Sequence, residues 1–241
     1  MNIGFYEGAS GLVAFQNEMN VVGNNIANSG TTGYKPTTTS FEDLLHYRMY
    51  VNSTEEPLQG TGTRNVSTGM DMTQQSLLST EGDLDYAITG DGFFAVDNNG
   101  TTAYTRCGSF QAADDGTGKF YLADGEGHFV LNAQGGRIPL TRNVQMGRFE
   151  DVSKQIGVFQ FQNPGSLTQL SDNLYAANTN SGQAVAATAD VQVKNGYLEQ
   201  SGTSLEDEMT NMIMAQRGFQ MSARVLQANN EVEDTINNLR S

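Results

Sequence analysis

The sequence is poor in the residue types that build disulfide frameworks and metal centres. Its 241 residues include one cysteine, two histidines and no tryptophan. The single thiol, Cys107, excludes a disulfide framework and a metal site made from several cysteines. His46 and His128 have no third ligand at a recognised spacing, so we interpret both as ordinary surface or strand residues. We therefore expect no metal and no cofactor.

Basic residues and long apolar runs are also scarce. The chain has 13 Lys and Arg residues against 27 Asp and Glu residues, a formal net charge of −14. Such a surface repels nucleic acid and anionic lipid, so we expect neither as a partner. No stretch approaches the ~20 apolar residues of a membrane span, which predicts no membrane insertion. No basic region precedes an apolar run at the start, and Glu7 interrupts it, so we expect no cleaved signal peptide.

The patterns that mark common catalytic sites are incomplete. The stretch 115–120 has Gly-Lys, but Ala113 and Phe120 stand where a phosphate loop needs Gly and Ser or Thr. The acidic residues at 114, 115 and 124 lack the calcium-loop pattern and suit turns. We expect Cys107 to fill a small apolar slot, with a reactive thiol beside Arg106 as the alternative. These observations predict that the chain is not an enzyme.

Three regions of different character predict an α+β fold. Residues 1–34 and 203–241 have helical patterns, and we expect them to pair as a coiled-coil-like bundle, forming a terminal helical domain. Residues 35–71 are expected to be a connecting, partly extended segment. Residues 72–202 are rich in Gly, Thr, Asn and Asp around short apolar runs, which predicts a central, irregular β-rich domain.

The N-terminal helix carries an apolar seam at heptad spacing. Its members are Phe5, Leu12, Phe15, Met19, Val22 and Ile26. Gly8, Gly11 and Gly23 lie within the same helix, where each costs about 0.5–1 kcal/mol relative to Ala. Close approach of another helix is one reason to keep glycine there. Asn and Gly residues then end the helix before Pro36.

The C-terminal helix has a clear start, with Thr203 or Ser204 as the N-cap and acidic residues in the first turn. Its predicted packing residues are Leu205, Met209, Met212, Ile213, Phe219, Leu226, Val232, Ile236 and Leu239. Met214 and Met221 add further apolar faces. A helix with several apolar faces needs several neighbours. Packing between copies accounts for these faces better than a hairpin within one monomer, which remains the alternative.

Turn signals divide the central region into hairpins. Residues 97–100, Asp-Asn-Asn-Gly, separate the runs 93–96 and 102–105 in the manner of a β-hairpin. Further turns are predicted at 114–118 and 124–127, and a strand at 156–161. The polar stretch 52–63 is expected to be extended or mobile.

Collinear motifs along nearly the whole chain resemble those of bacterial flagellar rod and hook proteins. The N-terminal signature includes Asn24, Asn25, Ala27, Asn28, Gly33, Tyr34 and Lys35. The central motif contains Gly90, Gly92, Phe93 and Phe94, and is followed by 104–110. The C-terminal signature spans 208–221 and contains Arg217.

This resemblance implies a structural subunit of the flagellar basal body. In the family, terminal helices form a helical polymer around a channel, and subunits leave through the flagellar type III export apparatus. The implied partners are further copies, and other rod proteins and the hook protein axially. Surrounding ring proteins are a further candidate that the resemblance suggests. The implied role is to transmit torque from the motor to the hook.

Within the family, chain length favours a rod protein over a hook protein. The motifs at 60–62 and 104–110 favour the distal rod, but a short 46–59 segment and Cys107 in place of an acidic residue keep the proximal rod as an alternative. A secreted, oligomeric binding module is the alternative from another class.

Overall fold

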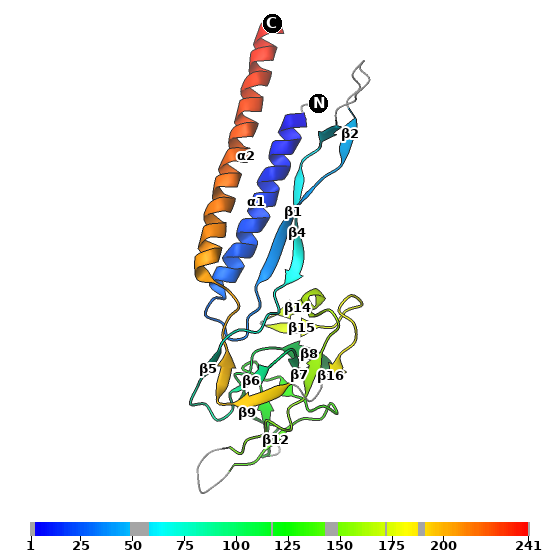
Figure 1. Ribbon diagram of the computed structural model, residues 1–241, viewed down its shortest axis with the longest axis vertical. Coiled ribbons are helices and arrows are strands. Elements are labelled where there is room, and N and C mark those ends of the chain that lie inside the picture. The colour runs from blue at the N-terminus through cyan, green and yellow to red at the C-terminus, as the bar shows by residue number, and fades with distance from the viewer. Residues whose placement is uncertain are drawn as a thin grey trace. The chain divides into compact units, whose positions relative to one another are not determined.

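The computed structural model describes residues 3–48, 58–116, 118–142, 149–171, 173–187 and 191–240. The chain forms two compact units. The helical unit comprises Met1–Ala27, Thr37–Gly69 and Ser204–Ser241, and the β-rich unit comprises Asn28–Pro36 and Met70–Thr203. Helices at both ends and antiparallel strands between them confirm the α+β class (Figure 1).

The helical unit contains both helices and four strands. These are α1 (Ile3–Ala27), α2 (Leu205–Arg240), β1 (Thr37–Asp43), β2 (His46–Arg48), β3 (Leu58–Gly60) and β4 (Thr63–Met70). Strand β1 pairs with β4, and β2 pairs with β3. Residues 37–69 thus belong to the helical unit, although the sequence suggested a separate connector at 35–71. The first half of the polar stretch 52–63 lies outside the described residues, and its second half contains β3 and the start of β4.

Both helices begin or end where the sequence predicts. The start of α2 selects Ser204 as its N-cap, because the Ser204 hydroxyl accepts the Asp207 N–H at 3.4 Å. The alternative, the Thr203 hydroxyl, is buried and has no hydrogen-bond partner within the described ranges. Helix α1 ends at Ala27. The chain then turns through Gly33, whose φ of 68° lies in the left-handed region.

The β-rich unit is built from short antiparallel strands. They are β5 (Leu77–Ser79), β6 (Tyr86–Thr89), β7 (Phe93–Asn98), β8 (Thr101–Thr105), β9 (Gln111–Asp114), β10 (Phe120–Ala123), β11 (Phe129–Val130), β12 (Pro139–Leu140), β13 (Val158–Gln160), β14 (Thr168–Ser171), β15 (Leu174–Ala176), β16 (Val185–Ala186), β17 (Gln192–Asn195) and β18 (Tyr197–Glu199). A 3₁₀ turn spans Pro164–Ser166. The main sheet runs β12-β10-β11-β7-β8-β15-β14, with β13 and β16 beside β7, and β9 beside β10. Two smaller pairs, β17-β6 and β18-β5, complete it.

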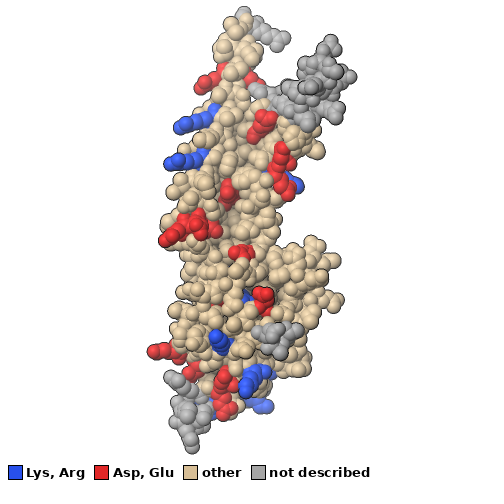
Figure 2. Space-filling model, viewed as in Figure 1, with Lys and Arg blue, Asp and Glu red and all other residues tan. Residues whose placement is uncertain are grey.

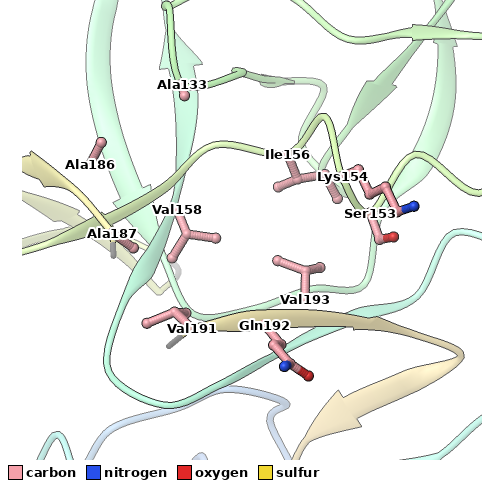
Figure 3. Close-up of a pocket in the computed structure, with 10 residues that line it drawn as sticks. All are labelled: Ala133, Ser153, Lys154, Ile156, Val158, Ala186, Ala187, Val191, Gln192 and Val193. Carbon is pink, nitrogen blue, oxygen red and sulfur yellow. The ribbon is translucent and has the colours of Figure 1, made fainter. Parts of the chain in front are cut away.

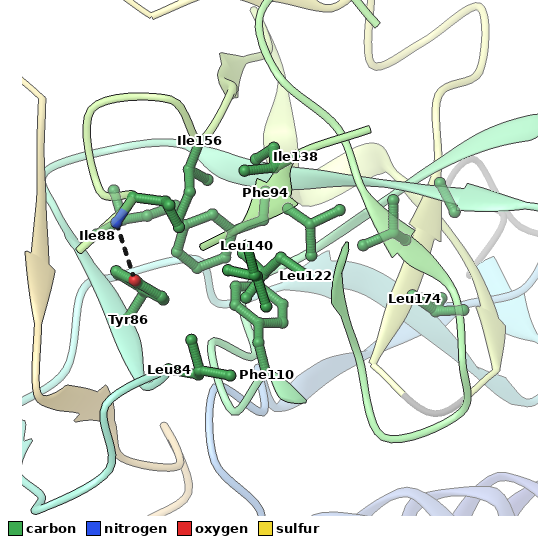
Figure 4. Close-up of a cluster of buried hydrophobic side chains, with 14 residues drawn as sticks. Leu84, Tyr86, Ile88, Phe94, Phe110, Leu122, Ile138, Leu140, Ile156 and Leu174 are labelled. Carbon is green, nitrogen blue, oxygen red and sulfur yellow. Dashed lines mark hydrogen bonds between the residues drawn. The ribbon is translucent and has the colours of Figure 1, made fainter. Parts of the chain in front are cut away.

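Strand β7 is the centre of this unit because apolar layers cover both of its faces. Phe94 and Val96 point into the larger cluster, which also contains Tyr86, Phe110 and Leu122 (Figure 4). The alternate residues, Phe93 and Ala95, point into a second cluster around Tyr104 and Tyr175. This alternation follows from the two-residue period of a strand. A run buried on both faces explains why residues 93–96 are continuously apolar.

The predicted hairpins form. Strands β7 and β8 pair with Asn98 opposite Thr101, which leaves Asn99 and Gly100 as a two-residue loop. Both loop residues have positive φ, 52° and 87°, as a type I′ turn requires. Strands β9 and β10 flank the turn at 114–118, and β11 follows the turn at 124–127. The strand predicted at 156–161 is shorter, because Ile156 enters the core and the Gly157 N–H bonds Leu131 before β13 begins.

Candidate assembly site

The two helices pack antiparallel along a seam of small residues. A methyl group placed on Gly11 would lie 2.9 Å from the Ser222 hydroxyl oxygen. One placed on Gly8 would lie 3.1 Å from Leu226, and one on Gly218 would overlap the Phe15 ring. The sequence-based expectation of close approach is therefore confirmed at Gly8 and Gly11, whereas a methyl group on Gly23 would meet only the Met212 Cε at 3.8 Å, an ordinary contact. Because side chains of one helix lie directly against glycine backbone of the other, the seam fixes the register of the helices.

Asn25 joins three elements of the helical unit. Its side chain is buried. The amide Nδ2 donates to the Glu208 carboxylate at 2.8 Å and to the Thr37 carbonyl at 3.0 Å. Its Oδ1 accepts the Thr37 N–H at 3.2 Å. One motif residue thus ties the end of α1 to the start of β1 and to the first turn of α2.

Helix α1 also contacts the strands, through Phe15 beside the seam and through Ser10 on another face. The rings of Phe15 and Phe41 lie 5.1 Å apart, centre to centre. The Ser10 hydroxyl accepts the Thr63 N–H at 3.2 Å and donates to the Glu7 carbonyl at 2.9 Å. These contacts explain why residues 37–69 belong with the helices.

The predicted packing residues fall into two groups. Val22 is buried, and the half-buried ones lie in or beside the seam: Leu12, Phe15, Met19, Ile26, Met212, Phe219 and Leu226. The exposed ones are Phe5, Leu205, Met209, Ile213, Val232, Ile236 and Leu239. Met214, Met221 and Val225 of α2 are exposed as well. One chain therefore leaves much of the apolar surface of α2 in contact with water.

A seam substitution tests the role of the glycines. We expect Gly11→Val to destabilise the helical unit by about 1–3 kcal/mol, because the new side chain must displace Ser222 or push the helices apart. Thermal unfolding followed by circular dichroism at the helix band measures the change. Val13→Leu is the matched control, since Val13 is exposed on the same helix. Equal midpoints for both variants would show that the seam tolerates bulk.

The motif residues that follow α1, in the segment 28–36, belong to a different site inside the β-rich unit. Tyr34 and Lys35 are buried, and the Lys35 ammonium donates to Glu199 at 2.8 Å and to the Thr73 carbonyl at 2.6 Å. The Gly33 N–H donates to the Glu199 carbonyl at 2.9 Å. Residues 28–36 are thus held beside the end of β18.

Arg106 completes a buried ion cluster. Its Nε donates to the Glu199 carboxylate at 2.6 Å, and its two terminal nitrogens donate to the carbonyls of Gly90 and Gly92. The Gln75 N–H adds a bond to Glu199 at 2.9 Å. Each carboxylate oxygen therefore has a cationic donor, which is the condition under which a buried charge is tolerated.

Burial and pairing shift the pKa values in this cluster. Burial alone would raise the pKa of Glu199, but the charges and hydrogen bonds of Arg106 and Lys35 outweigh it and hold that pKa below its ordinary value. Burial lowers the pKa of Lys35, and Glu199 partly offsets this effect. The negative charge of Glu199 therefore offsets the cost of burying the two cations, Lys35 and Arg106.

Backbone contacts explain the glycines around the cluster. A methyl group on Gly33 would lie 2.7 Å from the Arg106 carbonyl carbon. One on Gly108 would overlap the Tyr86 carbonyl oxygen. The carbonyls of Gly90 and Gly92 receive Arg106, while Phe93 and Phe94 enter the two core clusters. The central motif is thus a structural one.

The remaining motif residues lie at the edges of these two sites. The Asn28 carbonyl accepts the Ser201 hydroxyl at 2.9 Å, so the segment leaving α1 is tied to the segment that approaches α2. Asn24 and Ala27 are exposed at the end of α1, and Arg217 is exposed on α2. Arg217 therefore contributes to the outer surface of α2.

Glu199, Thr73 and Gln75 were not singled out from the sequence. The only signal was a charged residue next to the apolar pair 197–198, which a partly exposed strand explains equally well. Cys107, by contrast, is half-buried with its Sγ 3.3 Å from the Thr32 hydroxyl. His128 lies 3.0 Å from the Asp124 carboxylate, and His46 lies 2.9 Å from Asp43.

A hollow of about 450 Å³ opens on the β-rich unit, between β13, β16 and β17 (Figure 3). Its walls are mostly valine, isoleucine and alanine, with Ser153, Lys154 and Gln192 as the polar members. The Ser153 hydroxyl is bonded to Asp151 at 3.0 Å. Within the described ranges, no group of three His, Cys, Asp or Glu residues could hold a metal ion. None of the described helices is long and apolar enough to cross a membrane.

Three family models match three successive parts of the chain. The model for flagella basal body rod proteins matches residues 5–35, which contain most of α1 and the segment that follows it. The model for the D1 domain of the flagellar hook protein FlgE/F/G matches residues 87–121, and that for the C-terminal part of flagellar basal body rod FlgEFG proteins matches residues 194–239. These ranges contain Asn25, Lys35, Arg106 and Glu199.

Similar proteins cover almost the whole chain. The flagellar basal-body rod protein FlgG of Bacillus subtilis is 34% identical over 98% of this chain and 98% of its own length. FlgG of Borreliella burgdorferi is 30% identical over 96% of both chains. The rod protein FlgF of Caulobacter vibrioides is 29% identical over 94% of this chain and 93% of its own length. The chain therefore belongs to the flagellar basal-body rod protein family, as a structural subunit of the distal rod in the bacterial flagellar basal body.

Proposed function

We propose that this subunit polymerises through its helical unit into a helical tube. The observation that carries the proposal is the exposed apolar surface of α2, including Met209, Ile213 and Val232. Burying apolar surface contributes about 25 cal/mol per Å², so association supplies the burial that one chain lacks. The face shown in Figure 2 has extended surfaces without charged side chains, which suits packing between copies.

In this proposal residues 1–34 and 203–241 form the tube, as a coiled-coil-like bundle. Its contacts are made by the packing residues predicted from the sequence. The segment 35–71 connects them to the central β-rich domain at 72–202. A contact between two different surfaces does not close on itself, so repeated contacts of this kind generate an open helical array.

The subunit assembles with other rod and hook components of the basal body. We propose that the axial neighbours are related rod proteins and the hook protein, and that ring proteins surround the rod. We also propose delivery by the flagellar export apparatus, as the family resemblance implies. We further propose that the protein has no catalytic role and transmits torque through its packed helices.

Removing the helices tests the proposal. We expect the full-length chain to form rods or filaments above a threshold concentration, and a variant lacking residues 1–34 and 203–241 to form none. Electron microscopy and sedimentation measure the two outcomes. A variant that keeps both helices but carries Glu81→Gln, an exposed position, is the control. Rods formed by the truncated chain would contradict a helix-based polymer.

A further inference from the structure

Helix α2 is longer than the helix on which it packs. It has 36 residues and α1 has 25. The antiparallel register places Gly4 against Asn229. Residues 230–240 therefore continue past the start of α1 for about 15 Å, at 1.5 Å per residue (Figure 1). We call this segment the α2 overhang.

The α2 overhang has an apolar side that is exposed in the part of the chain that the structure describes. Val232, Ile236 and Leu239 are 55%, 55% and 84% exposed. Their spacings of four and three place them on one helix face. A stripe of three aliphatic side chains in water at the end of a helix is costly unless another surface covers it.

A groove lies on the far side of α1, between that helix and β4. Its volume is about 360 Å³, and its lining includes Tyr6, Ser10, Val13, Asn17, Arg64 and Asn65. Tyr6 and Val13 are 52% and 62% exposed. The face of α1 that contains Gly8 and Gly11 is occupied by α2, so the chain's own α2 does not fill the groove.

The α2 overhang and the groove match in length. The overhang is about 15 Å long, and the helical wall of the groove, from Tyr6 to Asn17, is about 16 Å long. Arg64, the one charged residue of the lining, is bonded to the Glu42 carboxylate of its own chain at 2.8 Å. The exposed side chains of Tyr6 and Val13 are therefore what the groove offers to an apolar stripe.

One polar group of the groove also lacks a partner in the single chain. The Asn65 amide nitrogen is buried and has no acceptor among the residues that the structure describes. A buried donor left unpaired costs about 1–3 kcal/mol. A neighbouring helix with polar side chains beside its apolar stripe offers acceptors there.

We propose that the α2 overhang of one copy docks in the groove between α1 and β4 of a neighbouring copy. The proposal rests on the polymerisation proposed above and assigns one of its contacts. Because overhang and groove are different surfaces, each copy offers one and receives the other. The contact is therefore heterologous and propagates along the polymer.

Cysteine cross-linking of the full-length chain tests this docking. In a Cys107→Ala background, we expect Val13→Cys with Ile236→Cys to give a ladder of disulfide-linked oligomers when the protein polymerises. Val13→Cys with Ile213→Cys is the matched control, because Ile213 is similarly exposed on α2 but lies outside the overhang. Gel electrophoresis without reductant, after mild oxidation, measures both pairs.

A second measurement uses the threshold concentration for polymerisation. We expect Ile236→Asp with Leu239→Asp to raise it at least about tenfold, since two docked apolar side chains become charged. Asn237→Asp adds a charge to the same exposed turn and should leave the threshold within about twofold.

The outcomes separate the two proposals. Polymers that form without the Val13–Ile236 ladder, or with an equal ladder from the control pair, overturn the docking and leave polymerisation intact. An unchanged threshold in the doubly charged variant overturns the docking too. A full-length chain that never polymerises overturns both.

Discussion

Replacing Glu199 by Gln is expected to lower the free energy of unfolding of the β-rich unit by about 3–5 kcal/mol. Gln is nearly isosteric, so packing changes little, but its amide keeps one acceptor oxygen and places an N–H donor where the other was. What it removes is the negative charge between Lys35 and Arg106, whose side chains are almost fully buried. Two cations at hydrogen-bond distance from one neutral amide then repel each other and have no counter-charge.

Chemical denaturation followed by tyrosine fluorescence measures this loss, because Tyr86 and Tyr175 lie in the core of the unit. Glu81→Gln removes the same charge at an exposed position and should cost less than about 0.5 kcal/mol. Since the pKa of Glu199 is lower in the folded state, the unfolded state binds more protons as pH falls below about 4.5. The native chain should lose this contribution there, and the Gln variant should not. If the free energies of unfolding of the native chain and the Gln variant change with pH in the same way, the role assigned to Glu199 is wrong.

The local features of this fold are predictable because their causes lie within a few residues. The loop at Asn99 and Gly100 needs two residues with positive φ, and Asn-Gly supplies them. The start of α2 needs an acceptor for its free N–H groups, and Ser204 provides it. Helical periodicity over residues 205–240 is strong enough to identify one long helix without tertiary information.

The buried ion cluster is not predictable in this way. Lys35, Arg106 and Glu199 come from three distant segments, and each residue alone suits an exposed position. Only the fold shows that these segments meet. The contact between the Phe15 and Phe41 rings, which brings β1 to α1, is not predictable from composition either, because it joins two separate segments. The sequence also does not show which apolar residues of the helices are buried, because burial depends on the neighbours that a single chain provides.

Gly108→Ala is the second substitution with a large expected effect, about 3 kcal/mol or more in the same unit. A methyl group at Gly108 would overlap the carbonyl oxygen of Tyr86, a backbone atom that no rotamer change can remove. Relief requires the two backbones to separate, which breaks the 3.0 Å hydrogen bond from the Tyr86 N–H to the Gly108 carbonyl. The adjoining pair between Asp85 and Ser109 is lost with it. The damage lies next to Tyr86, Phe94 and Phe110, so the larger core cluster must repack as well.

The control is a glycine in an open turn. Replacing it by alanine shows the general effect of a glycine-to-alanine change without overlap between backbones. At Gly125, the nearest atom to an added methyl group is 3.6 Å away, on the flexible side chain of Gln111. Gly125→Ala should therefore be neutral or stabilising by up to about 1 kcal/mol, because alanine restricts the unfolded chain. Denaturation midpoints and soluble yield of the two variants measure the difference. If Gly108→Ala unfolds at the same midpoint as Gly125→Ala, the close approach of residues 86 and 108 does not hold the β-rich unit together. If only Gly108→Ala is destabilised, the glycine of the 104–110 stretch is required by packing of one backbone on another, and not by assembly.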